Sequence, residues 1–228
     1  MGKVIIQDYT TKNPLQLMGT EAGVCWNAKL NDEEKNIARG KDCILSGHGR
    51  VMEYAEVYMV LDDYSARVIR EFYTHIGGAP SRLQSSTRYI DYESIFTFVT
   101  PPSIESKEYL RAAYEATMKV IQEKMKYLEE EGVPREDCAM LLPLGMTTRV
   151  VVRMNARTLM DMSRQRLCSR AYWEFRQLFR DIYKALSTYS DEWEWICENC
   201  FMPKCEALGY CPEKKGCGKY PTKQDNET

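Results

Sequence analysis

Residues 154–179, MNARTLMDMSRQRLCSRAYWEFRQLF, decide the fold of this chain. They follow a β-branched run, RVVVR at 149–153, so we expect a strand that leads into a helix. In the second half of the stretch and just beyond it, large apolar residues recur at intervals of three and four, which is typical of a helix face packed on a core. These residues are Phe175, Leu178, Phe179, Ile182 and Leu186.

The first half of the stretch carries an unusual group of polar side chains. Asn155 suits a helix N-cap, whereas Arg157, two residues later, opposes the helix dipole. Asp161 and Arg166 follow, and guanidinium groups offer rigid pairs of donors to phosphate or carbonyl oxygens. The group therefore suits a planar anionic ligand, although a solvated charged face explains it equally well from chemistry alone.

The same stretch resembles the C-terminal signature of the flavin-dependent thymidylate synthases, in which an Asn-x-Arg precedes a second Arg and then Ala-Gln-Trp-Glu-Ile. Tyr172 replaces the usual Gln, and Phe175 replaces the Ile. Upstream, QSSTRY at 84–89 resembles the end of the family's Arg-His-Arg…Ser…Asn-Glu-x-Ser-x-Arg-Tyr motif, and the likeness spans residues 48–186. The positions that match the C-terminal signature are Asn155, Arg157, Arg166, Ala171, Trp173 and Glu174.

This resemblance implies reductive methylation of dUMP to dTMP, with methylenetetrahydrofolate as carbon donor and FAD, reduced by NADPH, as hydride source. Arg166 would be catalytic, because a cation beside the pyrimidine stabilises developing negative charge. The resemblance also implies a homotetramer with shared active sites. The predicted dUMP-binding residues are Arg82, Gln84, Ser85, Ser86, Thr87, Arg88 and Arg166. The predicted flavin-binding residues are His48, Arg50, His75, Gly77, Gly78, Asn155, Arg157 and Asp161.

The chain departs from the family in its central loop. Counted back from the Arg-Tyr at 88–89, the family's Arg-His-Arg falls on Ile-Gly-Gly at 76–78 and its Asn-Glu on Leu-Gln at 83–84. We expect the loop backbone, which two glycines make accessible, and the side chains of His75 and Arg82 to replace the missing contacts. The departure leaves open a related uridylate hydroxymethylase as the alternative enzyme.

The composition is that of a globular protein with one main core. Of 228 residues, 44% are hydrophobic and 28% charged, as is usual for globular proteins. The net charge of -2 gives no basic excess for nucleic acid or membrane surfaces, and no apolar run reaches the about 18 residues of a membrane span. The N-terminal MGKVIIQDYT has no signal-peptide pattern, so we expect a cytoplasmic location.

The end of the chain differs from the rest because it is rich in cysteine. We therefore divide the chain into a catalytic domain at 1–190 and a cysteine-rich extension at 191–228. Thiolates held in tight turns are typical of a structural zinc site. A cysteine-rich tail without a metal is the competing interpretation. A non-catalytic nucleotide-binding protein with such a tail is the rival of another class. The candidate zinc ligands are Cys197, Cys200, Cys205, Cys211 and Cys217.

The predicted fold class is α+β, a mixed sheet with long helices. No G-x-G-x-x-G or phosphate-loop sequence is present, so a flavin would not be held in a Rossmann manner. Helices are expected near 65–75, 103–131 and 156–188. Strands are expected near 4–7, 54–61, 95–100 and 148–154.

Overall fold

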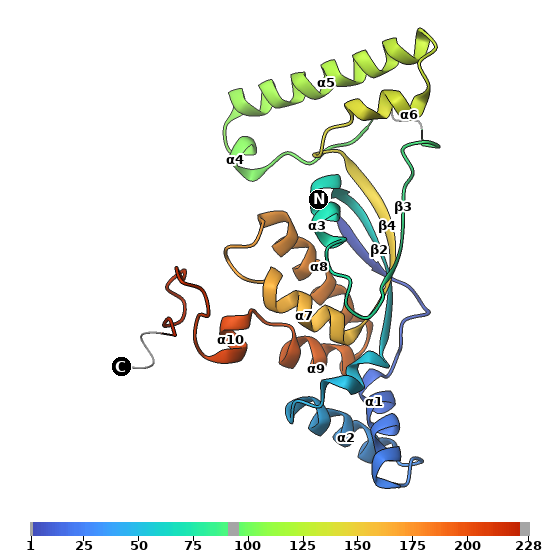
Figure 1. Ribbon diagram of the computed structural model, residues 1–228, viewed down its shortest axis with the longest axis vertical. Helices are drawn as coiled ribbons and strands as arrows, with labels where there is room; N and C mark the ends of the chain where they lie inside the picture. Colours follow the sequence, from blue (N-terminus) through green and yellow to red (C-terminus); the bar gives the residue numbers. More distant parts are fainter. Residues whose placement is uncertain (1, 91–95, 224–228) are drawn as a thin grey trace. The chain divides into compact units, whose positions relative to one another are not determined.

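The computed structural model describes residues 2–90 and 96–223 and has a four-stranded sheet with helices, which confirms the α+β prediction (Figure 1). The strand order is β1-β2-β4-β3. In the two central strands buried residues alternate with more exposed ones, as expected for strands with one face on a core; Val57, Met59, Val150 and Val152 are fully buried. The strands are β1 (Lys3–Ile6), β2 (Glu56–Ser65), β3 (Ser81–Gln84) and β4 (Thr147–Asn155).

The helices vary from single turns to the long α5. Three 3-10 turns lie between them: η1 (Val24–Trp26), η2 (Gly49–Glu53) and η3 (Ala139–Leu141). The α-helices are α1 (Pro14–Gly23), α2 (Glu33–Leu45), α3 (Ala66–Phe72), α4 (Pro102–Glu105), α5 (Glu108–Glu130), α6 (Arg135–Cys138), α7 (Ala156–Arg166), α8 (Trp173–Tyr189), α9 (Asp191–Cys200) and α10 (Lys204–Leu208). No helix in the described ranges is long and apolar enough to cross a membrane.

The chain forms two compact units, and strands β2 and β4 contribute residues to both. The first unit has a small core in which Phe96 and Met146 pack with Met118 and Met125 of α5. The division at residue 190 that the sequence suggests stays a prediction. The first unit comprises Met1–Lys3, Leu61–Glu71 and Leu83–Val150, and the second Val4–Val60, Phe72–Arg82 and Val151–Thr228.

The core of the second unit is built on α8. All five residues of the predicted apolar stripe on this helix have 0% exposure, which confirms that prediction. α9 packs on α8 and adds the fully buried Trp193, whose indole N–H donates to the carbonyl of Thr11 at 2.8 Å. The helix that follows the predicted ligand-binding residues is therefore part of the core of this unit.

The structure corrects three of the predicted elements. The helix expected at 156–188 is two helices, α7 and α8, separated by residues 167–172. The strand expected at 95–100 is not formed by its described residues; Phe98 makes only an isolated bridge with Met146, and residue 95 lies outside the described ranges. The helix expected at 103–131 is interrupted between α4 and α5, and β3 was not predicted.

Candidate functional site

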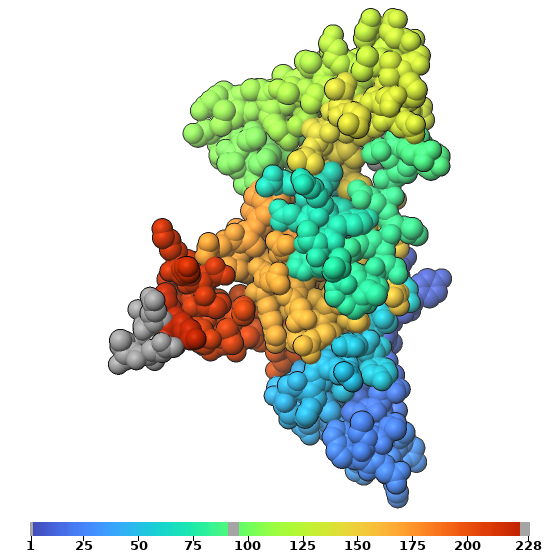
Figure 2. Space-filling view, in the orientation of Figure 1, coloured from blue at the N-terminus to red at the C-terminus, as the bar shows by residue number. Residues whose placement is uncertain are grey.

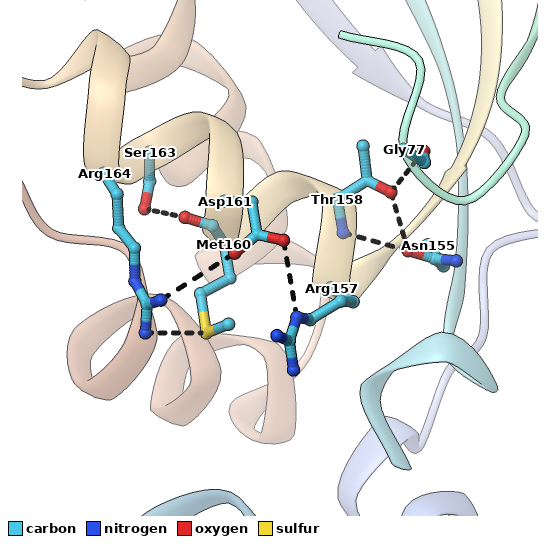
Figure 3. A network of polar contacts seen from close by, with 8 residues as sticks. All are labelled: Gly77, Asn155, Arg157, Thr158, Met160, Asp161, Ser163 and Arg164. Carbon is cyan, nitrogen blue, oxygen red and sulfur yellow. Dashed lines mark hydrogen bonds and ion pairs between the residues drawn. The ribbon is translucent and has the colours of Figure 1, made fainter. Parts of the chain in front are cut away.

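The start of α7 is organised by Asn155, which lies where β4 passes into the helix. Its Oδ1 accepts the backbone N–H of Thr158 at 2.9 Å, so Asn155 is the N-cap of α7 (Figure 3). The Thr158 hydroxyl donates to the carbonyl oxygen of Gly77 at 2.7 Å. The predicted flavin-binding residues Asn155 and Gly77 are therefore joined through Thr158 in one partly buried hydrogen-bond network.

Gly78 lies against the same network in a conformation that other residues avoid. Its φ is +68°, and a Cβ at this position would lie 2.6 Å from both Asn155 Nδ2 and Thr158 Oγ1. A side chain here would be strained by the positive φ and would clash with these two atoms, so the position requires glycine. The glycines that replace the family's Arg-His-Arg thus allow the loop backbone to approach the beginning of α7 closely.

A third segment reaches α7 through Gly49 of η2. A Cβ on Gly49 would lie 1.6 Å from Nη1 of Arg157, so the guanidinium packs directly on the backbone between the exposed His48 and Arg50. Arg157 Nε also lies 3.4 Å from Asp161 Oδ2 (Figure 3). The structure therefore brings the backbone between the predicted residues His48 and Arg50 to Arg157, which in turn pairs with Asp161 one turn further along α7.

Arg166 is the last residue of α7; the sequence had predicted it partway along a longer helix. Its Nε donates to Nε2 of His75 at 2.9 Å, and its guanidinium carbon lies 4.5 Å from the centre of the Phe175 ring. Burial first, and then the positive charges of Arg166 and Arg82, lower the pKa of His75 to about 4. His75 is therefore neutral at physiological pH and can accept the hydrogen bond.

Arg82, predicted to bind dUMP, is fastened to the turn that contains His75. Its Nη1 donates to the carbonyl of Tyr73 at 3.1 Å, and its Nη2 donates to the carbonyl of His75. Burial lowers the pKa of Arg82. Its buried Nε has no hydrogen-bond partner within the part of the chain that the structure describes. Arg82 thus holds the His75 turn in place and keeps one donor uncommitted.

The other predicted dUMP-binding residues, 84–88, belong to the first unit and contact other residues of that unit. Gln84 Nε2 donates to Thr148 Oγ1 at 3.3 Å. Ser86 Oγ accepts the backbone N–H of Arg88 at 3.2 Å, and Arg88 forms an exposed ion pair with Glu136 at 3.0 Å. Ser85 and Thr87 lie between them and are partly exposed. Their predicted role in nucleotide binding stays a prediction.

The donor set at the start of α7 fits an anionic dinucleotide such as FAD. Arg157 lies in the first turn of the helix and packs on the backbone of Gly49, which His48 and Arg50 flank in the chain; the positive charge and N–H groups of a helix N-terminus favour phosphate. Gly78 lets the loop backbone lie directly against Asn155 and Thr158 at this helix start. The chemistry of these groups therefore agrees with the flavin prediction.

The five cysteines predicted as zinc ligands fall into two groups. Cys197 and Cys200 are buried in α9, and burial raises their pKa to about 12 and about 11. Cys205, Cys211 and Cys217 instead line a cavity of about 840 Å³ together with Cys168 of the α7–α8 loop. No three His, Cys, Asp or Glu side chains in residues 2–90 and 96–223 are already close enough to hold a metal ion.

The same cavity was not foreseen from the sequence. Arg166 lies on its wall, with Arg164, Arg170 and Lys204 among its other cationic neighbours. Figure 2 shows the C-terminal segment that forms the opposite wall as a separate lobe on the surface of the second unit. Cys205, Cys211 and Cys217 were singled out from the sequence, but nothing there linked them to Arg166 or to Cys168.

Comparison with known proteins gives consistent matches. Residues 6–189 match the family model described as Thymidylate synthase complementing protein. The chain is similar to a flavin-dependent thymidylate synthase of Pyrococcus furiosus, with 31% identity over 231 residues, 94% of this chain and 91% of the relative. It is also similar to a relative of the same name from Nitratidesulfovibrio vulgaris, with 29% identity over 219 residues, 87% of this chain and 84% of the relative.

A solved structure supports the fold. The crystal structure of flavin-dependent thymidylate synthase ThyX from Helicobacter pylori, complexed with FAD and dUMP, superposes with a TM-score of 0.69 and covers 87% of this chain and 99% of that chain. The two sequences are 17% identical, so this likeness shows the fold alone.

Proposed function

Because this chain belongs to the flavin-dependent thymidylate synthase family, we propose that it is an FAD-dependent enzyme that methylates dUMP to form dTMP. The observation that carries the proposal is the convergence of residues 48–50, 75–78 and 155–157 at the beginning of α7. These segments supply the phosphate-compatible donors and the close backbone approach that a flavin dinucleotide requires. Of these segments, 155–157 belongs to the signature that the sequence shares with the family, whereas 76–78 is where the sequence departs from it.

In this proposal Arg166 is the catalytic residue. Its guanidinium would lie beside the pyrimidine and stabilise the negative charge that develops when C5 becomes nucleophilic. The charge is fixed, because a guanidinium is not deprotonated in proteins. The hydrogen bond to His75 and the ring of Phe175 orient it before substrate arrives, so little reorganisation is needed in the transition state.

The remaining residues bind and orient. Arg157 and Arg50 would hold the flavin phosphates, and the loop at Gly77 and Gly78 would lie along the dinucleotide. When bound, FAD reduced by NADPH supplies the hydride, and methylenetetrahydrofolate supplies the carbon. Gln84, Ser85, Ser86, Thr87 and Arg88 would contact the nucleotide. We also propose a homotetramer, in which residues of more than one copy complete each site.

Two further parts of the proposal concern location and metal. The nine cysteines are free thiols among the described residues, which supports a reducing, cytoplasmic location. Zinc binding by the C-terminal segment is a separate proposal that metal analysis can test without reference to turnover.

The test is product analysis with the purified chain. We expect a yellow protein that converts dUMP to dTMP when FAD, NADPH and methylenetetrahydrofolate are all present. Hydroxymethylated uridylate in place of dTMP would favour the alternative enzyme. A colourless protein that binds dUMP without turnover after FAD is added would contradict the proposal and favour a binding protein.

A further inference from the structure

We propose, as an inference that rests on the proposed function, that the cavity beside Arg166 binds the glutamate tail of the folate co-substrate. The chain would then prefer folates that carry several γ-linked glutamates, whose carboxylates the cavity would hold. The cavity has a volume of about 840 Å³ and lies between the region around the α7–α8 loop and the C-terminal segment at 203–219. This volume is within the range of sites for small organic ligands.

The walls of the cavity carry a large excess of positive charge. Besides Arg166, their cationic side chains are those of Arg164, Arg170, Arg176, Arg180, Lys204 and Lys219. Glu213 is the only carboxylate on these walls in the part of the chain that the structure describes, and it already pairs with Arg170 at 2.9 Å. Since the whole chain has a net charge of -2, the positive charge is a local feature. A concave site of one sign attracts a ligand with several opposite charges.

Arg164 has hydrogen-bonding capacity that the protein does not use. Its guanidinium lies 3.7 Å from the sulfur of Met160 and 3.8 Å from Asp161 (Figure 3), both longer than an ordinary hydrogen bond to oxygen. Its buried Nε has no hydrogen-bond partner among residues 2–90 and 96–223. A buried donor without an acceptor is destabilising, and a carboxylate bound in the cavity is the acceptor that a guanidinium fits best.

Two arginines of α8 also face no protein carboxylate. Arg176 donates to main-chain carbonyl oxygens, among them that of Ala171 at 2.7 Å. Arg180 is exposed and donates to the amide oxygen of Gln177 at 3.4 Å. Neither makes an ion pair with a described residue, so their charges are available to a ligand.

The two walls are already joined, so the cavity exists before a ligand binds. Arg170 Nη1 donates to the carbonyl of Lys215 at 3.2 Å in addition to its ion pair with Glu213. On α7, the hydroxyl of Ser163 donates to the carbonyl of Met202 at 3.4 Å. A site that is formed in advance has a smaller entropic cost of binding than one that must be ordered by its ligand.

The place of the cavity along α7 identifies the ligand. Arg166 is the last residue of this 11-residue helix, which is about 16 Å long, whereas the groups proposed for the flavin phosphates lie at its first turn. The co-substrate that must reach the pyrimidine at Arg166 is the carbon donor, because NADPH needs to reach only the flavin. A folate with its reactive carbon at the pyrimidine carries its carboxylates at the opposite end, where the cavity would receive them.

The test is equilibrium binding of tetrahydrofolate, as monoglutamate and as triglutamate, to the flavin-loaded chain with dUMP present. We expect the wild type to bind the triglutamate about 10-fold more tightly, because each further carboxylate adds a weak, partly exposed ion pair. In the double variant Arg180→Gln/Lys204→Gln this preference should largely disappear. Equal affinity of the wild type for the two forms would overturn the proposal.

The matched control removes the same charge elsewhere. Lys119→Gln/Lys124→Gln changes two exposed lysines of α5, which do not line the cavity, and should keep the preference for the triglutamate. Loss of the preference in this control would show that net charge, and not the cavity, causes it. In the wild type the preference should also shrink in about 0.5 M salt, because partly exposed ion pairs are screened; a preference that does not change with salt would contradict ionic binding.

Steady-state kinetics separates this inference from the proposed function and from a site for the reductant. A chain that forms dTMP equally well from the monoglutamate and the triglutamate, with the same KM for both, would contradict only the inference. A chain that forms no dTMP from either folate would contradict the proposed function itself. A rise in the KM of NADPH in Arg180→Gln/Lys204→Gln, without a change in that of the triglutamate, would assign the cavity to the reductant and overturn the proposal.

Discussion

Arg166 and His75 form one polar unit: Nε of the arginine donates to Nε2 of the histidine at 2.9 Å. Phe175 contacts both, with its ring centre 4.5 Å from the guanidinium carbon and 5.7 Å from the centre of the imidazole. The guanidinium therefore has a fixed direction before any ligand binds. In this chain, which lacks the family's Arg-His-Arg, we predict that His75 positions Arg166.

The first prediction concerns this positioning. In His75→Ala the guanidinium loses its acceptor, and we expect kcat to fall by about 10- to 100-fold because the charge is misplaced. In His75→Gln an acceptor is restored, and we expect partial recovery. Flavin absorbance should be similar in both variants. Equal activity in His75→Ala and the wild type would show that the hydrogen bond has no positioning role.

The second prediction concerns the pH dependence of stability. The pKa of His75 is lowered from 6.5 to about 4 in the folded state, so between these values the unfolded chain binds a proton that the folded chain does not. The free energy of unfolding of the wild type should therefore fall as pH decreases from 6.5 to about 4. Chemical unfolding of His75→Gln, which does not titrate, should show a weaker decrease in this window. Parallel curves would contradict the assigned environment of His75.

The third prediction separates catalysis from flavin binding. Arg166→Ala removes the charge at the pyrimidine but none of the donors at the start of α7. We expect turnover to fall by at least about 100-fold, with flavin content unchanged by absorbance. In Arg157→Ala we expect the bound flavin itself to be lost. If Arg166→Ala retained near-normal turnover, its catalytic role would be wrong.

The fourth prediction compares two glycines with positive φ. Gly78→Ala adds a Cβ 2.6 Å from two polar atoms, whereas a Cβ at Gly132, which has φ +85°, meets no atom within 4 Å. We expect Gly132→Ala to lower the free energy of unfolding by about 1 kcal/mol through backbone strain alone. Gly78→Ala should lower the free energy of unfolding by more than this and should also weaken FAD binding. Normal FAD affinity in Gly78→Ala would remove this loop from the flavin site.

The fifth prediction concerns the first unit. Asp62 accepts two hydrogen bonds from Arg149, at 2.7 and 2.8 Å, and its side chain is 6% exposed. The hydrogen bonds from Arg149 lower the pKa of Asp62, so their stabilisation is present above its unfolded pKa and is lost as pH falls through the lower folded value. Asp62→Asn should lower the free energy of unfolding at pH 7 by about 1–3 kcal/mol. At acidic pH the difference from the wild type should shrink.

The core of the second unit was predictable because its signal is periodic. Phe175 and Leu178 recur at helical spacing and are fully buried, and the valines of 150–152 are β-branched and form β4. The sequence also predicted that Asn155 is a helix N-cap. These features depend on local sequence, so local rules identify them.

The break between α7 and α8 was not predictable, because residues 167–172 contain neither Gly nor Pro. Arg176 Nη1 donates to the carbonyls of Ser169 and Ala171 in this turn, and these stabilising contacts exist only once α8 has formed. β3 was missed for a similar reason: Arg82 and Leu83 lie in a strand without apolar alternation. Likewise, no spacing rule links Cys168 to cysteines near the end of the chain.

The most direct test of the account is a crystal structure of this chain with FAD and dUMP bound. We expect the guanidinium of Arg166 to lie against the uracil ring, with the flavin phosphates at Arg157 and the start of α7. A uracil ring bound elsewhere, or an Arg166 side chain turned to solvent in the complex, would contradict the central claim.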